Sequence, residues 1–414
     1  MSILAASCAP SGFGQLHTDP QPKLKDLGPL AINMWDFAWM MRHYKGGGME
    51  DWDKALDELV ERGYNALRVD CFPQFIAADS KGEHQDSFYC PRRNWRPALW
   101  DNQFSITIEP KKYLVEFLSK CIERNIYLGL SSWFLDFATG RVKEFRTVDD
   151  LVRAWDETLT FIEQQGLLKN VIYVDLLNEY PLWNGYSYRV LNKQLDKLKL
   201  KGGIENVSGG SYDFLNEKGR RFNGDQVTHY SGVMNELITK LSAKWPSLDF
   251  FASQTNTLNV PWQDLDVSNF SVLDIHAWFV YNVPFSRATN YFEDIHRLKN
   301  DMNFGKCNQK IKQYWKENKV SMVQWMEEQI ILRKNKALEL GVPYGNTEGW
   351  GTVMWMDHPD LDWDFTRETG LVCAELGAKH GYSFNCTSNF NHPHFGLWDD
   401  IAWHKEVTSI IRNG

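Results

Sequence analysis

Two glutamates in this chain of 414 residues each follow a short apolar run directly. Glu179 closes the segment Val-Ile-Tyr-Val-Asp-Leu-Leu-Asn-Glu over residues 171–179, and Glu348 closes Gly-Val-Pro-Tyr-Gly-Asn-Thr-Glu over residues 341–348. A carboxyl group at the tip of a buried strand is partly desolvated, which raises its pKa toward the range that a general acid needs. Two such groups facing one another could protonate a glycosidic oxygen and attack the anomeric carbon.

Either glutamate alone has a simpler interpretation. An isolated Asn-Glu pair more often caps a helix or forms a surface turn, and a lone glutamate at a strand end can be structural. Two of them on the same rim of one sheet favour catalysis. Their separation would then decide the stereochemistry, because roughly 5–5.5 Å between the carboxyl groups indicates retention and roughly 6.5–9.5 Å indicates inversion.

Three further side chains could support a reacting carboxylate. Arg68 lies inside an apolar strand, where a cation requires a partner. Glu348 is one candidate for that partner, and Asp36 or the nearby Asp70 are the alternatives. His276 ends the apolar run 272–276 and is either a site residue or a hydrogen-bonded core histidine. Asn178 could hydrogen-bond a sugar hydroxyl next to the reacting carbon.

Aromatic residues make up 14% of the chain, including 18 tryptophans, which is more than a core requires. Flat rings pack well against the C–H face of a pyranose, so roughly half of the aromatic residues near expected strand ends should form a sugar platform and the rest should pack at the rim. The candidate substrate-binding residues are Trp35, Asp36, Trp133, Trp278, Tyr281, Trp350, Trp355 and Trp398.

Short apolar runs alternate with longer stretches of helical periodicity, a pattern typical of a parallel sheet covered by helices. The expected strands are Leu30–Trp35, Ala66–Asp70, Tyr127–Ser131, Ile172–Leu177, Asp249–Ser253, Val272–His276, Pro343–Thr347 and Tyr382–Cys386. The expected helices are Trp52–Arg62, Lys111–Arg124, Asp149–Gln164, Thr228–Lys244, Ser321–Glu339, Thr366–Gly377 and Trp398–Ile411. The helix after the fifth strand is missing from this pattern.

The strand-to-helix connections are long, over residues 72–110, 181–227, 277–309 and 349–365, whereas the helix-to-strand connections are tight. In an α/β barrel this asymmetry places the elaboration on the C-terminal face, where active sites are built. An open doubly wound sheet would instead show a Gly-rich phosphate loop after its first strand, and residues 33–37 read Asn-Met-Trp-Asp-Phe. We therefore expect a single (β/α)8 TIM barrel over residues 28–414, preceded by a leader at 1–27.

The order of these motifs resembles the large clan of retaining (β/α)8 glycoside hydrolases, most nearly its cellulase-like members, over about residues 28–412. The resemblance implies an O-glycosyl hydrolase in which Glu179, after Asn178 at strand 4, is the acid/base and Glu348 at strand 7 is the nucleophile. Arg68 matches the clan's strand-2 arginine, which stabilises the nucleophile. His276 in the strand-6 segment Asp-Ile-His-Ala-Trp matches a histidine that meets the substrate or the nucleophile.

The chain departs from the clan pattern at three places. Tyr180 stands directly after Asn-Glu, where a proline is usual, and Pro181 follows it. Strand 3 ends in Ser-Ser-Trp over residues 131–133, where many members have a histidine. The usual strand-6 tyrosine is absent from its place, and Trp278 or Tyr281 could substitute for it. These departures affect the expected substrate more than the expected chemistry.

The net charge of −8 argues against a nucleic-acid partner, because such proteins carry a basic stripe, and favours a neutral glycoside or oligosaccharide as ligand. No run of eighteen apolar residues predicts a membrane span, and a cytoplasmic location is favoured. The seven scattered cysteines predict reduced thiols. Nothing in the sequence predicts the oligomeric state.

Histidines near carboxylates raise the alternative of a metal-dependent hydrolase. His392-Pro-His394 and Asp357-His358-Pro-Asp360 contain suitable ligand types, but their spacing is not diagnostic, and we interpret them as solvent-exposed loop histidines. We therefore expect neither a metal nor another cofactor. A non-catalytic carbohydrate-binding barrel remains the main alternative, since it would share the tryptophan-lined mouth without needing both glutamates.

Overall fold

The computed structural model describes residues 21–92, 100, 105–191, 194, 224–256, 262–291, 304–352, 357 and 361–414. The expected leader over residues 1–27 therefore lies largely outside the described residues. From residue 21 onward the chain first forms the turn η1, Leu24–Asp26, and then enters the sheet. Most of the expected strand-to-helix loops are described only in part.

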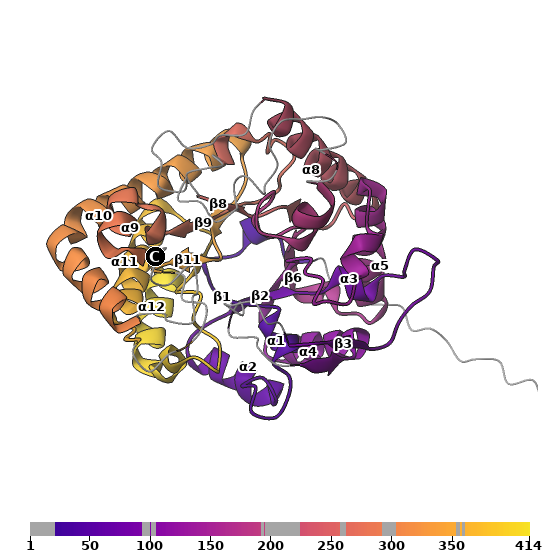
Figure 1. Ribbon diagram of the computed structural model, residues 1–414, viewed down its shortest axis with the longest axis horizontal. Coiled ribbons are helices and arrows are strands. Elements are labelled where there is room, and N and C mark those ends of the chain that lie inside the picture. The colour runs from indigo at the N-terminus through magenta and orange to yellow at the C-terminus, as the bar shows by residue number, and fades with distance from the viewer. Residues whose placement is uncertain are drawn as a thin grey trace, which may run out of the picture.

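A curled parallel sheet forms the centre of the molecule, with the helices packed around its outside (Figure 1). Its strands are β1 (Leu30–Asp36), β2 (Ala66–Asp70), β5 (Tyr127–Ser131), β6 (Val171–Asp175), β7 (Phe250–Phe251), β8 (Gln254–Thr255), β9 (Leu273–Trp278), β10 (Tyr344–Asn346) and β12 (Phe384–Cys386). β11, Gly349–Trp350, continues the seventh barrel strand beyond β10 and pairs with β9. These strands match the eight expected ones in place.

The fifth barrel strand is divided in two, and this division closes the ring. β7 pairs with β6, with Phe251 opposite Asp175, whereas β8 pairs with β9, with Thr255 opposite His276. Only residues 252 and 253 separate the two halves, so hydrogen bonding passes from β6 to β9 along one stretch of chain. On the other side, β12 joins β10 to β1. The chain is therefore a (β/α)8 barrel.

The long helices pack on the outer surface of the barrel. They are α2 (Trp52–Glu61), α4 (Pro110–Glu123), α5 (Val148–Gln164), α8 (Gly224–Lys244), α10 (Phe304–Leu340), α11 (Asp364–His380) and α12 (Ile401–Asn413). Several begin at the signals that the sequence carries: Asp51 accepts from the Lys54 N–H at the start of α2, and Thr147 forms a capping box with Asp150 at α5. Between β8 and β9, the described residues contain only the turn η7, Trp262–Asp264, so the missing fifth helix is confirmed for this part of the chain.

Several helix boundaries differ from the sequence-based expectation, and two of these differences have a clear physical reason. α10 begins at Phe304 rather than at Ser321, because buried residues at 304, 307, 311 and 315 continue a narrow apolar stripe through a lysine-rich stretch. The last helix begins at Ile401, since Asp400 caps it by accepting from the Trp403 N–H. Trp398 and Asp399, expected to lie in this helix, belong instead to the separate turn η10, Gly396–Asp399.

The elaboration lies on the C-terminal side of the strands, as expected. The strand-to-helix connections carry α1 (Ala38–Met41), α3 (Pro73–Ile76), η3 (Arg141–Glu144), the π-turn η5 (Ser187–Leu191), η8 (Phe279–Tyr281) and α9 (Val283–Thr289). They also carry an antiparallel hairpin of β3 (Phe88–Cys90) and β4 (Ile106–Ile108). On the opposite side, the only described elements within the helix-to-strand connections are short turns such as η4, Leu168–Asn170.

An aromatic layer fills the barrel below its C-terminal mouth. The ring of Tyr173 lies 5.2 Å from that of Phe251 and 5.9 Å from that of Phe384, measured between centroids. Gly129 on β5 makes room for it, because a Cβ atom there would lie 2.3 Å from the Tyr173 ring. This layer closes the floor of the mouth to water, so polar groups just above it are strongly desolvated.

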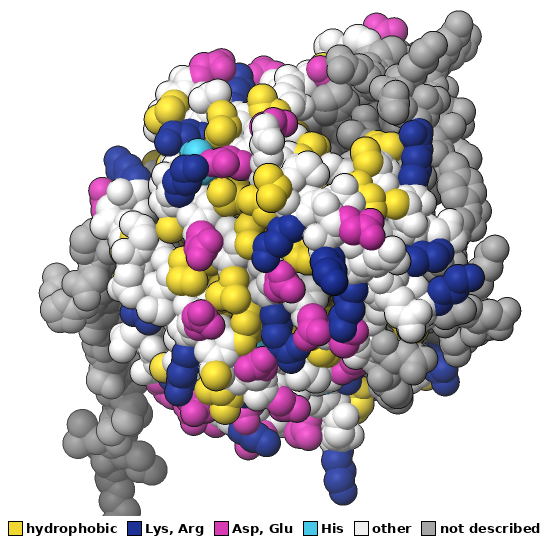
Figure 2. All heavy atoms as spheres, turned by 90° about the vertical axis from the view of Figure 1, so that its left-hand side faces the viewer, with side chains coloured by type: hydrophobic (Ala, Val, Ile, Leu, Met, Phe, Trp, Pro, Cys, Tyr) yellow, Lys and Arg dark blue, Asp and Glu magenta, His cyan; other side chains and the backbone are white. Residues whose placement is uncertain are grey.

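On the outer face of the molecule, α10 exposes several apolar side chains, including Val320 and Leu338. Figure 2 shows that hydrophobic side chains on this side alternate with acidic and basic ones. Among the described residues, no helix is long and apolar enough to cross a membrane. The six described cysteines are buried and form no disulfide with one another, and Cys8 lies outside the described residues.

Candidate active site

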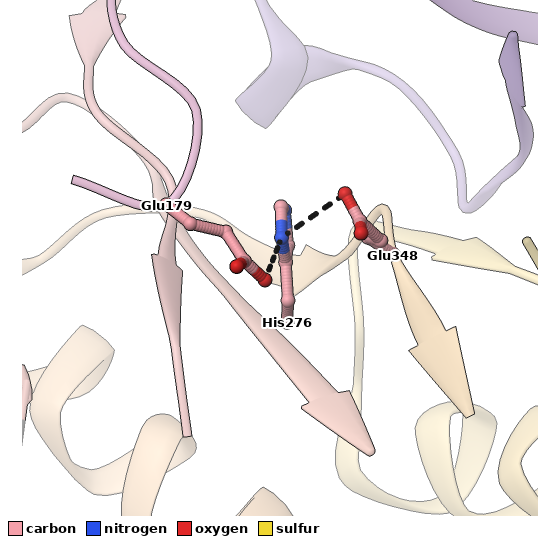
Figure 3. A group of neighbouring side chains, drawn as sticks. All are labelled: Glu179, His276 and Glu348. Atoms are coloured by element: carbon pink, nitrogen blue, oxygen red, sulfur yellow. Dashed lines mark hydrogen bonds and ion pairs between the residues drawn. The ribbon is translucent and has the colours of Figure 1, made fainter. Parts of the chain in front are cut away.

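Glu179 and Glu348 meet across the mouth of the barrel. Glu179 follows β6 and Glu348 follows β10, and Figure 3 shows their carboxyl groups pointing toward one another with His276 between them. One carboxylate oxygen of each glutamate and one ring nitrogen of His276 all lie within 4.8 Å of one another. Both glutamates are almost fully buried, with 5% and 3% of their surface exposed.

The backbone around Glu179 is held in an unusual conformation. Its φ of +43° lies in the left-handed region, which costs a residue other than glycine on the order of 1–3 kcal/mol. The Glu179 N–H donates to Oγ of Ser253 over 3.0 Å, and the Asn178 N–H donates to the carbonyl of Ser132 over 2.8 Å. Neighbouring strands thus hold the side chain at the mouth despite the local strain.

His276 of β9 contacts both glutamates through one nitrogen. Its Nδ1 lies 2.9 Å from Oε1 of Glu179 and 3.3 Å from Oε2 of Glu348. Its Nε2 lies 3.3 Å from Oγ1 of Thr347 and 3.6 Å from Oδ2 of Asp274. Burial alone would lower the pKa of His276, but the carboxylates of Glu348 and Asp274 outweigh burial and raise that pKa to about 10. The ring is therefore an imidazolium at neutral pH.

Arg68 of β2 is fully buried and lies among carboxylates. Nη1 is 3.1 Å from Oδ1 of Asp36 and 3.3 Å from Oε2 of Glu348, while Nη2 is 3.0 Å from Oδ2 of Asp175. Burial by itself would lower the pKa of Arg68, but Asp36, Asp175 and Glu348 together raise it well above its usual value. The expected partnership with Glu348 is present, and so is the alternative with Asp36.

Burial also dominates the protonation of Glu348. Desolvation raises the pKa of Glu348 to about 8, the nearby charge of Glu179 adds to this rise, and His276 and Arg68 oppose it. Two carboxyl groups this close cannot both be ionised easily, so near neutral pH the pair carries about one proton. One protonated and one ionised carboxyl group is the combination that acid-assisted displacement needs.

The chain matches the family described as sugar-binding cellulase-like over residues 32–412. It belongs to this family. A search of curated proteins found no match. The match spans the described strands from β1 onward and includes Glu179, Glu348, Arg68 and His276.

Solved structures share the fold of this cellulase-like chain. A candidate glycoside hydrolase from Parabacteroides distasonis is 29% identical, with 93% of this chain and 94% of that chain covered at a TM-score of 0.74. Cel5A from Thermotoga maritima, solved with cellobiose, is 10% identical with 92% and 97% covered and a TM-score of 0.53. An endo-β-1,4-mannanase from Thermotoga petrophila is 11% identical with 95% and 79% covered and a TM-score of 0.51. The last two likenesses show the barrel fold alone.

Trp133 and Asp36 reach the candidate site of the cellulase-like barrel. The Trp133 Nε1–H donates to Oδ2 of Asp36 over 2.7 Å, and its backbone N–H donates to Oδ2 of Asp70 over 2.8 Å. Because Asp36 also pairs with Arg68, the indole of Trp133 lies beside the buried charges. Trp278 ends β9 two residues beyond His276, and Tyr281 follows in η8.

Three other predicted tryptophans pack into the protein. The Trp35 ring lies 6.3 Å from Phe117 of α4 and 6.3 Å from Trp398, and its Nε1–H donates to the carbonyl of Asn391. Trp398 donates to Glu58 of α2, so both indoles pack between the sheet and its helices. Trp350 is fully buried and donates from Nε1 to the carbonyl of Cys386. Trp355 lies outside the described residues.

Sequence reasoning missed Asp175 and Asp274, two fully buried carboxylates of the site. Asp175 ends the apolar run of β6, and Asp274 lies two residues before His276, so both share the interior face with a recognised residue. Both carry the same sequence signal as Arg68, a charged residue inside an apolar strand that needs a partner. Thr347 and Ser253 carry no comparable signal, because small hydroxyl residues are common at strand ends.

The interpretation of His392 as an exposed loop histidine is wrong. Its side chain is fully buried, and burial lowers its pKa to about 3, because its ring packs against Trp100 and Phe395 of the cellulase-like barrel. Asp357 accepts from the Gly396 N–H, while His358 and Asp360 lie outside the described residues. Within the described part of the chain, Glu179, His276 and Glu348 form the only cluster with the spacing of metal ligands.

Proposed function

We propose that the chain is a retaining β-glycosidase with Glu179 as the acid/base and Glu348 as the nucleophile. The separation of the two glutamates carries this proposal. One carboxylate oxygen of Glu179 lies within 4.8 Å of one of Glu348, which is close to the roughly 5–5.5 Å of a double displacement and leaves less room than the roughly 6.5–9.5 Å that an inverting enzyme needs to hold a water. Membership of the cellulase-like family and the barrel fold support the same reaction class.

The surrounding contacts support these two roles. Arg68 touches Glu348, so a cation stabilises negative charge on that carboxylate, as a nucleophile requires. Because burial raises the pKa of Glu348 to about 8, the proton of the pair must pass from Glu348 to Glu179 before the first step. Glu179 then gives this proton to the leaving oxygen while the ionised Glu348 attacks the anomeric carbon and forms a glycosyl-enzyme. In the second step, Glu179 takes a proton from water, and this water attacks the same carbon and releases Glu348. Retention follows from the two inversions.

The charge around the site indicates a neutral sugar as substrate. Arg68 and His276 are the cations that contact the glutamates. Arg68 is already paired with Asp36 and Asp175, and His276 with Asp274. A uronate would therefore meet an excess of negative charge in a desolvated site. Structures of Thermotoga maritima Cel5A in complex with mannotriose and with cellobiose suggest neutral β-linked gluco- or manno-oligosaccharides as the first panel to test.

Replacement of each glutamate by glutamine tests the proposal. We expect Glu348→Gln to abolish turnover nearly completely and Glu179→Gln to lower kcat about 10²–10⁴-fold on substrates with a poor leaving group, with far-UV circular dichroism unchanged. Glu116→Gln, on the exposed side of α4, is the matched control and should keep full activity. Azide should rescue Glu348→Gly with inverted product configuration, seen by proton NMR. Full activity of Glu348→Gln would refute the assignment.

Sugar binding without turnover is the second candidate, and one observation favours it. His276 contacts both glutamates, so the two carboxyl groups that would have to react are already paired with its ring. Calorimetric titration of the wild-type protein with cellobiose, mannobiose and their trimers decides between the two candidates. Saturable binding without released reducing sugar over a broad panel would favour the binding protein, whereas turnover that depends on Glu348 favours the glycosidase.

A further inference from the structure

Asp274 lies behind His276, on the side away from the two glutamates. The two residues are two positions apart on β9, so both side chains point into the barrel. Oδ1 of Asp274 accepts from the Thr347 backbone N–H over 3.0 Å, and Oδ2 accepts from Oγ1 of Thr347 over 2.5 Å. Oδ2 also lies 3.6 Å from Nε2 of His276. Asp274 is 1% exposed, so water does not screen these contacts.

Two routes connect this one carboxylate to the reacting pair. Through Thr347, it holds the backbone directly before Glu348. Through His276, it reaches the ring whose Nδ1 contacts Glu179 and Glu348. Both ring nitrogens thus face acceptor oxygens, which fits an imidazole with a proton on each nitrogen.

We infer that Asp274 is a positioning residue that keeps His276 doubly protonated between the two glutamates, and that this buried cation sets the pH range in which the pair carries one proton. The inference rests on the proposed function for its kinetic consequences only. The charge of His276 does not depend on turnover and can be measured without a substrate.

The charges around His276 come from five strands. Glu179 lies at the end of β6, Glu348 after β10 and Asp274 on β9, while Asp36 of β1 acts from across the barrel and Arg68 of β2 contacts Glu348. Burial would raise the pKa of Asp274, yet His276 and Arg68 lower it below its usual value, so this carboxylate stays ionised. A negative charge close to Nε2 in a desolvated site favours the charged form of the ring.

Asp274→Asn tests the inference, because it keeps the shape of the side chain and removes its charge. We expect His276 to become neutral near pH 7, and both glutamates then to hold their protons to higher pH. The pH profile of kcat/KM should shift upward by at least about one pH unit at both limbs. A purely structural role would lower the profile at every pH without moving its limbs.

Thr347→Val is the matched control, since it removes the hydroxyl contact and keeps the carboxylate. It should lower kcat/KM without shifting the limbs. NMR of ring-labelled histidine supplies a readout that needs no turnover: His276 should remain an imidazolium to about pH 9 in the wild-type protein and lose that signature near neutral pH in Asp274→Asn. A neutral His276 in the wild-type protein at pH 7, or unshifted limbs in a folded Asp274→Asn, would overturn the inference. Absence of wild-type turnover would count against the proposed function alone.

Discussion

Arg68 donates a hydrogen bond from Nη2 to Oδ1 of Asn178 over 2.5 Å. A guanidinium has only donors, so this contact fixes which end of the Asn178 amide is the oxygen. The Nδ2 group then donates to the carbonyl of Trp183 over 3.2 Å and keeps a second N–H. We expect that hydrogen to donate to a sugar hydroxyl beside the reacting carbon, where such bonds strengthen in the transition state.

Asn178→Ala should therefore lower kcat/KM by about 10²–10³-fold, the usual effect of removing one donor aimed at a transition state. Asn178→Asp should be similarly impaired, because it offers Arg68 an acceptor but gives the sugar no donor. Steady-state kinetics on an oligosaccharide gives the measurement. Asn170→Ala in η4, at the opposite end of the barrel, is the matched control and should be unaffected. Normal activity of Asn178→Ala would show that the amide does not bind the sugar.

Arg68 should contribute strongly to stability, since three buried carboxylates depend on it. We expect Arg68→Met to lower the free energy of unfolding at pH 7 by about 3–5 kcal/mol, because it leaves those carboxylates without their shared cation. Arg68→Lys should lower the free energy of unfolding less, because lysine keeps the charge but lacks the planar fork of donors. Urea unfolding followed by fluorescence measures both. The loss should shrink as pH falls and the carboxylates protonate. Arg124→Lys supplies the control, since this partly buried arginine at the C-terminal end of α4 pairs with the exposed side chains of Asp53 and Asp57. A pH-independent loss would contradict the electrostatic explanation.

The positions of the strand ends were predictable, because a polar residue interrupts each apolar run where the barrel opens. β2 and β5 have the expected bounds, and the two glutamates lie on one rim as their strand order requires. The direction of Trp35 was not predictable. Met34 is opposite Arg68 inside the barrel, so Trp35 points outward, and a register shift with φ of +38° at Asp36 returns the next side chain to the interior. Such an irregularity depends on contacts between strands that the hydrophobic pattern does not encode.

Glu348→Gln should stabilise the protein as pH rises. Because the pKa of Glu348 is about 8 in the folded chain and lower in the unfolded chain, the native state retains a proton that the unfolded state has lost. The wild-type free energy of unfolding therefore falls between about pH 4.5 and pH 8, and glutamine removes this fall. The advantage of Glu348→Gln should grow to the order of a few kcal/mol at pH 8 and level off above it. Urea titrations at pH 5, 7 and 9 measure it, and a constant difference at all three values would disprove the expected coupling.

Buried neutral histidines should make the fold sensitive to acid. The hydroxyl of Tyr64 lies 2.8 Å from Nδ1 of His404, and Nε2 of the same ring lies 3.1 Å from the Leu397 carbonyl. Burial lowers the pKa of His404 to about 3. The unfolded chain binds a proton there near pH 6.5, so stability is present above pH 6.5 and is lost as pH falls toward 3. His404→Asn should be less stable at pH 7 but show a shallower decline below pH 6. His84→Asn, at an exposed position, should keep the wild-type slope, and an equal slope in His404→Asn would place the acid sensitivity elsewhere.

Activity should survive removal of metal ions, even though Glu179, His276 and Glu348 have the spacing of a metal site. With a pKa of about 10, His276 carries a proton on Nδ1, so the lone pair that would bind a metal is not available at neutral pH. Dialysis against EDTA should leave kcat/KM unchanged at pH 7. Added Zn²⁺ should inhibit, and more strongly as pH rises, since the metal must displace the ring proton. Loss of activity on chelation, with recovery on adding a divalent ion, would instead establish metal-dependent hydrolysis.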